Sequence, residues 1–192
     1  MKLIFAIDPG CRQSAYVVWD GVKIQQMHLL PNEELRSHLK AWVTTWTPDK
    51  IVAIERMQCF GRPVGEEVFE TCYMIGRLME IVVPTGYERY CTDQVQLVSR
   101  IDVKNWHCHS SLARDPHIRQ AMIDKYGKPG TKKKPGLITY GIHGDLWSAF
   151  AIATYVVESR HWTVPRMEQG PRPCQMVAAA STPTCPALGE CQ

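Results

Sequence analysis

Three acidic residues that lie far apart in the sequence border segments that should be buried. Asp8 follows the apolar residues 3–7, and Glu55 follows the apolar residues 51–54. Asp145 opens an alanine-rich segment with a helical pattern. A carboxylate at the end of a buried strand is costly unless a cation or hydrogen bonds compensate it. Mg²⁺ binds few carboxylates and keeps water molecules that a phosphate can replace. The three acids therefore predict a divalent metal site that acts on a phosphate group.

Two of these acids also have ordinary structural explanations. Asp-Pro-Gly is a common turn sequence, so Asp8 could simply shape a turn. Asp145 could simply cap its helix. Glu55 is harder to explain in this way, because its neighbour Arg56 should face the opposite side of the strand. Taken together, the three acids favour the metal site over three unrelated local roles.

The segments around these acids alternate between predicted strands and helices. Apolar and alternating patterns predict five strands, over residues 3–7, 14–19, 22–29, 51–55 and 95–99. Helical spacing predicts helices over residues 32–47, 66–83, 103–106, 116–126 and 145–159. We expect Asn32 and Asp115 to cap two of these helices. The pattern of the second helix predicts a buried face made of Val68, Cys72, Ile75, Met79 and Val82.

Positive charge is concentrated in one part of the chain. The formal net charge is only +3, but residues 100–134 hold nine Lys or Arg residues against three Asp. A basic region close to an acidic metal site is typical of a nuclease, because the basic side chains hold phosphates and the acids hold metal. A solvated surface without a partner would show the same composition.

The ordered motifs of the chain resemble one nuclease family. A strand followed by Asp-Pro-Gly, a strand followed by Glu, and Asp-x-x-Ser-Ala-x-Ala-x-Ala on a late helix resemble the RuvC-type Holliday junction resolvases. These enzymes belong to the RNase H-like superfamily, and the bacteriophage and prophage branch is the most similar. The segment 115–127, the lysines at 132–134 and Tyr140-Gly141 also resemble that branch. The resemblance covers roughly residues 1–158 and implies an α/β fold with a mixed five-stranded sheet flanked by helices.

The resemblance also implies an activity and its cofactor. Asp8, Glu55 and Asp145 would be the catalytic metal ligands, holding two Mg²⁺ ions that Mn²⁺ could replace. The reaction would be hydrolysis of phosphodiesters in four-way and other branched DNA, leaving 5′-phosphates. A homodimer would present two sites to the two symmetric strands of a junction.

One position departs from the resolvase pattern. That pattern usually places a second ligand three residues after the first on the late helix, where this chain has Ser148. A hydroxyl is a poor substitute for a carboxylate on Mg²⁺. His143 is close enough in sequence to act instead, as a ligand or in proton transfer, although a solvent-exposed loop histidine is an equally ordinary interpretation.

Two segments are candidates for DNA contacts. The loop 57–65 carries Phe60 and Arg62 and follows Arg56, so an apolar side chain between arginines could enter the centre of a junction. Phe60 could equally fold back onto the core. Lys132, Lys133 and Lys134 precede Asp145 and would hold the arms of the DNA.

The chain of 192 residues predicts one nuclease domain, residues 1–163, and a tail, residues 164–192. The tail is rich in proline, cysteine and small residues without a period, which predicts disorder. The sequence shows neither a signal peptide nor an apolar run of membrane-spanning length. We therefore expect a protein of the cytoplasm, that of the bacterial host if a phage encodes it, without membrane contact.

Two rival functions fit the same residues. A general nuclease of this fold could act on flaps, forks or RNA–DNA hybrids instead of junctions. Alternatively, the protein could bind DNA junctions with a catalytic site that has decayed, and Ser148 would be the sign of that loss. Cleavage assays on these substrates separate the three possibilities.

Overall fold

The structure is a computed structural model that describes residues 2–45, 47, 49–59, 61, 63–83, 94–136 and 138–159. The predicted tail, residues 164–192, lies outside the described residues. The strands are β1 (Leu3–Asp8), β2 (Gln13–Trp19), β3 (Ile24–Pro31), β4 (Lys50–Arg56) and β5 (Val95–Ser99). The helices are α1 (Asn32–Thr44), α2 (Glu66–Val82), α3 (Arg100–Cys108), α4 (Asp115–Tyr126) and α5 (Leu146–Ser159).

The five strands form one mixed sheet with the order β3-β2-β1-β4-β5. The first three strands pair antiparallel, whereas β4 runs parallel to both β1 and β5. The long connections that parallel pairing requires are supplied by helices. The predicted mixed five-stranded sheet flanked by helices is therefore confirmed.

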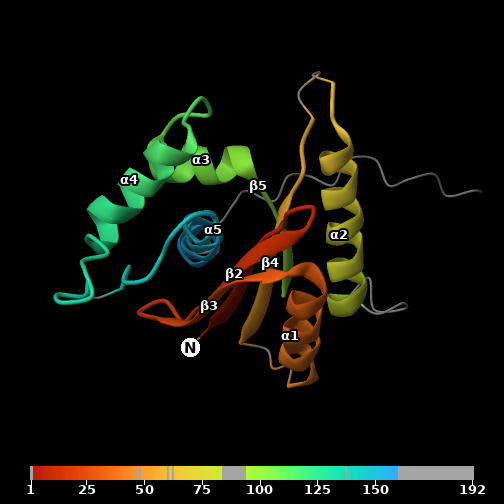
Figure 1. The fold of residues 1–192 in the computed structure, drawn as a ribbon, viewed down its shortest axis with the longest axis horizontal. Helices are drawn as coiled ribbons and strands as arrows, with labels where there is room; N and C mark the ends of the chain where they lie inside the picture. The colour runs from red at the N-terminus through yellow and green to blue at the C-terminus, as the bar shows by residue number, and fades with distance from the viewer. Residues whose placement is uncertain are drawn as a thin grey trace, which may run out of the picture. The chain divides into compact units, whose positions relative to one another are not determined.

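Helices cover both faces of this sheet (Figure 1). On one face α5 packs on the central strands, with α3 and α4 outside it, around a core that includes Trp19 and Phe150. On the other face α1 and α2 pack around a core that includes Phe5 and Leu35. The strands β1 and β4 are thus buried on both faces, which explains their nearly continuous apolar sequences.

Small residues allow α5 to lie close to the sheet. Ala6 and Ala53 point from β1 and β4 into the core that α5 covers, whereas Ile7 and Ile54 point into the opposite core. Three alanines of α5, at positions 149, 151 and 153, are also fully buried in the α5 core. The alternation of side chains along a strand then places Asp8 and Glu55 on the α5 face, in step with Ala6 and Ala53.

The structure confirms part of the predicted buried face of α2 and corrects the rest: Val82 is buried, and Ile75 and Met79 pack against the core. The residues that α2 buries are Thr71, Met74, Leu78 and Val82. Cys72 is exposed instead, and Thr71 is buried because its hydroxyl donates a hydrogen bond to the Glu67 carbonyl oxygen. Apolar residues occur around much of this helix, so its sequence pattern did not define one face.

Two predicted helix caps are also wrong. Pro31 occupies the N-cap position of α1, and Asn32 uses its side chain to hold the loop after β1. Arg114 occupies the N-cap position of α4, and Asp115 forms an ion pair with Arg100. Both side chains were expected to bond their own helix, and both instead bond a segment distant in sequence.

Within the part of the chain that the structure describes, no helix is both long enough and apolar enough to span a membrane.

Candidate metal site and DNA-binding surface

The sheet register brings two of the predicted acids together. β1 and β4 run parallel, and Ile7 pairs with Ile54. Asp8 and Glu55 are the next residues on the two strands, so both carboxyl groups emerge at the same end of the sheet. Each is only partly exposed, and the Glu55 side chain retains 12% of its surface. The two carboxyl groups lie close enough that the charge of Glu55 raises the pKa of Asp8.

The loop after Asp8 is closed by hydrogen bonds rather than by apolar packing. The Gly10 amide donates to Ser14 Oγ over 3.1 Å, and Ser14 Oγ donates to Asn32 Oδ1 over 2.7 Å. Asn32 Nδ2 in turn donates to the carbonyl oxygens of Gly10 and Cys11. A side chain at position 10 would collide with the Gln13 carbonyl oxygen, so glycine is required there. This loop fixes the end of β1 and therefore Asp8.

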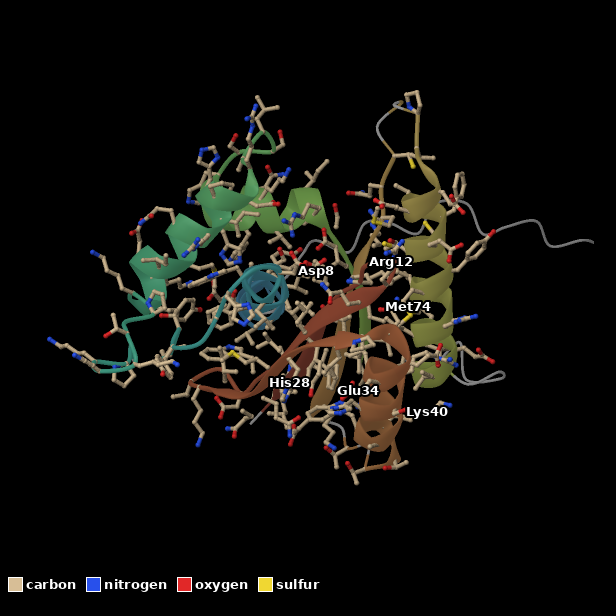
Figure 2. All side chains as sticks on the ribbon, in the orientation of Figure 1. Asp8, Arg12, His28, Glu34, Lys40 and Met74 are labelled. Carbon is tan, nitrogen blue, oxygen red and sulfur yellow. The ribbon has the colours of Figure 1, made fainter. Side chains whose placement is uncertain are left out.

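The start of α5 supplies the third acid (Figure 2 shows Asp8 where β1 meets α5). Asp145 directly precedes α5, and its carbonyl oxygen accepts bonds from the amides of Ser148 and Ala149. Its carboxylate is exposed but close enough to raise the pKa of Asp8. The Ser148 hydroxyl is hydrogen bonded to Asp8. The fold therefore brings Asp8, Glu55 and Asp145 to the same end of the sheet.

A fixed cation lies among these acids. Arg100 begins α3, directly after β5, which lies beside β4. Its Nη1 donates to Glu55 Oε2 over 3.2 Å, and its Nη2 bonds Asp115 Oδ1. Only 21% of the Arg100 side chain is exposed. The guanidinium therefore neutralises part of the negative charge that the strands bring together.

Burial and like charges change the acidity of the site. Burial, followed by the charges of Glu55 and Asp145, raises the pKa of Asp8 to about 8, against the opposing effects of Arg100 and Ser148. Burial also raises the pKa of Glu55, and Arg100 opposes that shift. A pair of carboxyl groups that keeps a proton near neutral pH has too little positive charge around it.

This donor set fits a divalent cation. The available ligands are carboxylate oxygens, which Mg²⁺ and Mn²⁺ prefer, and a bound cation would displace the proton of the Asp8–Glu55 pair. Among the described residues, no three His, Cys, Asp or Glu side chains form a complete metal-binding group as they stand. Asp8 and Glu55 are therefore the two closely placed carboxyl groups, and Asp145 is more exposed.

The structure exposes His143 in the approach to α5, two residues before Asp145, and its carbonyl oxygen accepts the Leu146 amide. Ser148, on the first turn of α5, is close enough to Asp8 to lower the pKa of that carboxyl group.

The predicted DNA contacts lie at two places. Arg56 is exposed at the end of β4, next to Glu55, whereas Phe60 and Arg62 lie outside the described residues. Lys132, Lys133 and Lys134 are all exposed. They occupy a tight turn that is closed by a β-bridge between Gly130 and Pro135. The turn displays three positive charges without burying any of them.

A pocket of ≈ 650 Å³ is lined by residues that follow the strands of the site, among them Gln58 after β4 and Ile101 after Arg100. Ser99 Oγ, at the end of β5, donates a hydrogen bond to Gln58 Oε1. Lys104 and Arg114 line it, together with Leu112, whose side chain is 87% exposed. Two cations and an exposed apolar side chain suit a nucleic-acid strand that passes over the acids.

Sequence reasoning missed Arg100, Asp115 and the pocket. Arg100 was counted only as part of the basic region, and Asp115 was assigned to a helix cap. A signal was present, because Arg100 directly follows a predicted strand, as Asp8 and Glu55 do. Without the strand order, however, nothing in the sequence says that the end of β5 lies beside Glu55.

Solved structures of RuvC share this fold. A structure of T. thermophilus RuvC in complex with a Holliday junction substrate matches with a TM-score of 0.58 and 14% identity, covering 81% of this chain and 92% of that chain. A second Thermus thermophilus RuvC structure matches with a TM-score of 0.55 and 18% identity, covering 83% and 95%. No protein-family model and no curated protein matches the sequence. The chain therefore has a RuvC-like fold, as its motifs predicted.

Proposed function

We propose that this protein is a metal-dependent endonuclease that resolves four-way and other branched DNA. The observation that carries the proposal is the meeting of Asp8, Glu55 and Asp145 at one end of a RuvC-like sheet. The RuvC relative was solved with a Holliday junction substrate, which supports the same substrate class here. The phage-type motifs support a phage or prophage origin and action in the host cytoplasm.

The proposed reaction is hydrolysis of a phosphodiester. A water oxygen bonds to phosphorus, the bond between phosphorus and the 3′ oxygen breaks, and the product carries a 5′-phosphate. The water loses a proton to solvent, and the 3′ oxygen gains one. Mg²⁺ or Mn²⁺ bound at the acids would lower the pKa of the water and stabilise the leaving oxygen.

The residues of the chain prepare this site before DNA arrives. Asp8 and Glu55 hold the cation, and Asp145 adds charge from the start of α5. The Ser148 hydroxyl orients the Asp8 carboxylate, because it bonds that group in the structure. The rigid loop around Gly10 keeps Asp8 in place, so little reorganisation is required when the substrate binds.

Junction arms would contact the basic surfaces on either side of the acids. Arg56, Lys104 and Arg114 lie next to the site, and the lysines at 132–134 lie farther along the chain, before α5. These side chains would bind phosphates, which fix position and shape but carry no base sequence. Selectivity would then come from junction shape.

A homodimer would form through the outer face of α2. Phe69 and Tyr73 lie one helical turn apart and are 53% and 66% exposed. Gly76 continues this face, and a Cβ atom there would meet no atom within 4 Å. Exposed aromatic side chains grouped in this way mark an interaction surface. A second copy is the proposed occupant, because a two-fold junction requires two identical sites.

The first prediction concerns Asp8→Asn. The variant should lose at least 95% of the cleavage of a labelled four-way junction in Mg²⁺, and should bind the junction as tightly as the wild type or more tightly. Removing one negative charge cannot weaken phosphate contacts. Gel assays on a junction, a flap, a fork and an RNA–DNA hybrid measure both properties.

The rival functions give different results in this assay. Equal wild-type cleavage of flaps or hybrids would favour the general nuclease. Binding without cleavage in Mg²⁺ or Mn²⁺ would favour the decayed module. Sealing of the nicks by DNA ligase tests the predicted 5′-phosphate.

The second prediction concerns stability in EDTA. Because the pKa of Asp8 is about 8 in the folded protein and about 4 in the unfolded chain, folding retains a proton there. The contribution of Asp8 to stability should therefore fall as pH rises from about 4 to about 8. The Tm of Asp8→Asn minus that of the wild type should grow over this range and level off above it.

Asp124→Asn, which changes an exposed carboxylate on α4, is the control and should give a flat difference. Added Mg²⁺ at pH 8 should raise the Tm of the wild type and of the control, but not that of Asp8→Asn. A pH-independent difference for Asp8→Asn would contradict the assigned environment of this carboxyl group.

The third prediction concerns the lysine turn. Changing Lys132, Lys133 and Lys134 together to alanine should weaken binding to all DNA shapes about equally. The slope of log affinity against log salt should become shallower by up to about three. Lys40→Ala, on the distant helix α1 (Figure 2), should leave the slope unchanged. The turn is only a solvated loop if the triple variant keeps the wild-type slope.

The fourth prediction concerns the dimer. Changing Phe69 and Tyr73 to glutamate should produce monomers, which light scattering after gel filtration would measure. The monomers should nick one strand of a junction without cutting its symmetric partner. Val22→Glu alters a residue that is 67% exposed on another surface and should leave the dimer intact. An intact dimer in the double variant would place the interface elsewhere.

A further inference from the structure

We propose that Arg100 provides the second positive charge of this site, so that the chain binds one divalent cation rather than two. The inference rests on the proposed function and concerns the same acids. Two ions are a common solution for phosphodiester hydrolysis, with one near the attacking water and one near the leaving oxygen. In this chain a side chain already occupies one of the two cationic positions.

The position of Arg100 follows from the sheet. Val98 pairs with Glu55, and Ser99 is the last residue of β5. Arg100 therefore starts α3 at the same end of the sheet as the acids, where β1, β4 and β5 end. Ser99 caps α3 by accepting the Ile101 amide, which fixes the first turn of the helix. The guanidinium is thus anchored to the sheet rather than carried on a mobile loop.

Arg100 contacts two carboxylates, as a bound cation would. One nitrogen bonds Glu55, an acid of the metal site, over 3.2 Å. The other bonds Asp115 at the start of α4. Arginine remains protonated in proteins, and its planar fork suits carboxylate and phosphate oxygens. A metal ion that used the same Glu55 oxygen would have to displace the guanidinium.

The charges near the strand ends support one ion. Asp8, Glu55, Asp145 and Asp115 together carry up to four negative charges, and Arg100, which pairs with Glu55 and Asp115, contributes one positive charge. One divalent cation reduces the remaining negative charge from up to three to one. A second ion would reverse the sign of the charge and would lie beside the guanidinium, where like charges repel.

The outer side of Arg100 is suited to the DNA phosphate. Asp115 is 75% exposed, so the bond to Arg100 lies at the surface. A phosphate that replaced the Asp115 carboxylate would meet the same nitrogen. During cleavage the guanidinium would balance charge on a non-bridging phosphate oxygen, while the water oxygen bonds to phosphorus and the 3′ oxygen leaves with a proton. Arginines that act on transferring phosphoryl groups accelerate them by about 10³–10⁵.

The test counts bound Mn²⁺ by electron paramagnetic resonance, without DNA, in four proteins. The wild type and Arg100→Lys should bind one ion per chain, and Arg100→Gln should bind two. Arg36→Gln is the control, because Arg36 has a similar exposure of 23% and pairs with Glu33 away from the site. It should bind one ion and cleave like the wild type.

Cleavage under single-turnover conditions is the second measurement. Arg100→Gln should be slowed at least about 10³-fold at low metal concentration. Its rate should rise with the second power of Mn²⁺ concentration, because a second ion replaces the lost charge, whereas the wild-type rate should rise with the first power.

Two bound ions in the wild type, or one ion and an unchanged rate in Arg100→Gln, would overturn the inference. If Arg100→Gln does not fold, two ions in either the wild type or Arg100→Lys would still overturn it. The outcomes for the proposed function are separate. A wild type that binds one Mn²⁺ but cuts no DNA refutes the nuclease, whereas one that cuts DNA and binds two refutes only the role of Arg100.

Discussion

The repulsion between Asp8 and Glu55 is the constraint on which the rest of the site depends. Parallel pairing of β1 and β4 places both acids at the same end of the sheet, where burial raises the pKa of each. At an effective dielectric constant near 20, two such charges would repel by about 4 kcal/mol at 4 Å. The fold limits this cost with a proton retained on Asp8 and with the Arg100 guanidinium. A metal ion can replace the proton, and a phosphate can bind the guanidinium.

The close packing of α5 makes this arrangement possible. Alanines on β1, β4 and α5 let the helix approach the sheet, so the residues at its start reach Asp8. Larger side chains would lift the helix and carry Asp145 and Ser148 away. The far end of α5 is held by Glu158, which accepts bonds from Trp106 and Tyr126 and pairs with Lys125. The helix is therefore anchored at this end to α3 and α4, which also carry Arg100 and Asp115.

The sequence predicts the parts of this protein whose signals are local. Apolar runs located all five strands, and the acids that end two of them lie together in the structure because β1 and β4 run parallel. The side chains that act across the fold were not predictable in this way. Asn32 and Asp115 are good helix caps by residue type, yet tertiary partners bind both. The buried face of α2 was located only in part, because apolar residues surround that helix.

Ser148 shows how the two kinds of information combine. In the sequence it stands where the resemblance expects an acid, which left a histidine ligand or a lost function as explanations. In the structure its hydroxyl bonds Asp8, and it adds no charge to a pair that already keeps a proton. An acid at this position would add a negative charge, and Arg100 alone could not balance it. A serine beside Asp8 and an arginine beside Glu55 are therefore consistent with each other, because both reduce the positive charge that the site must obtain from bound metal.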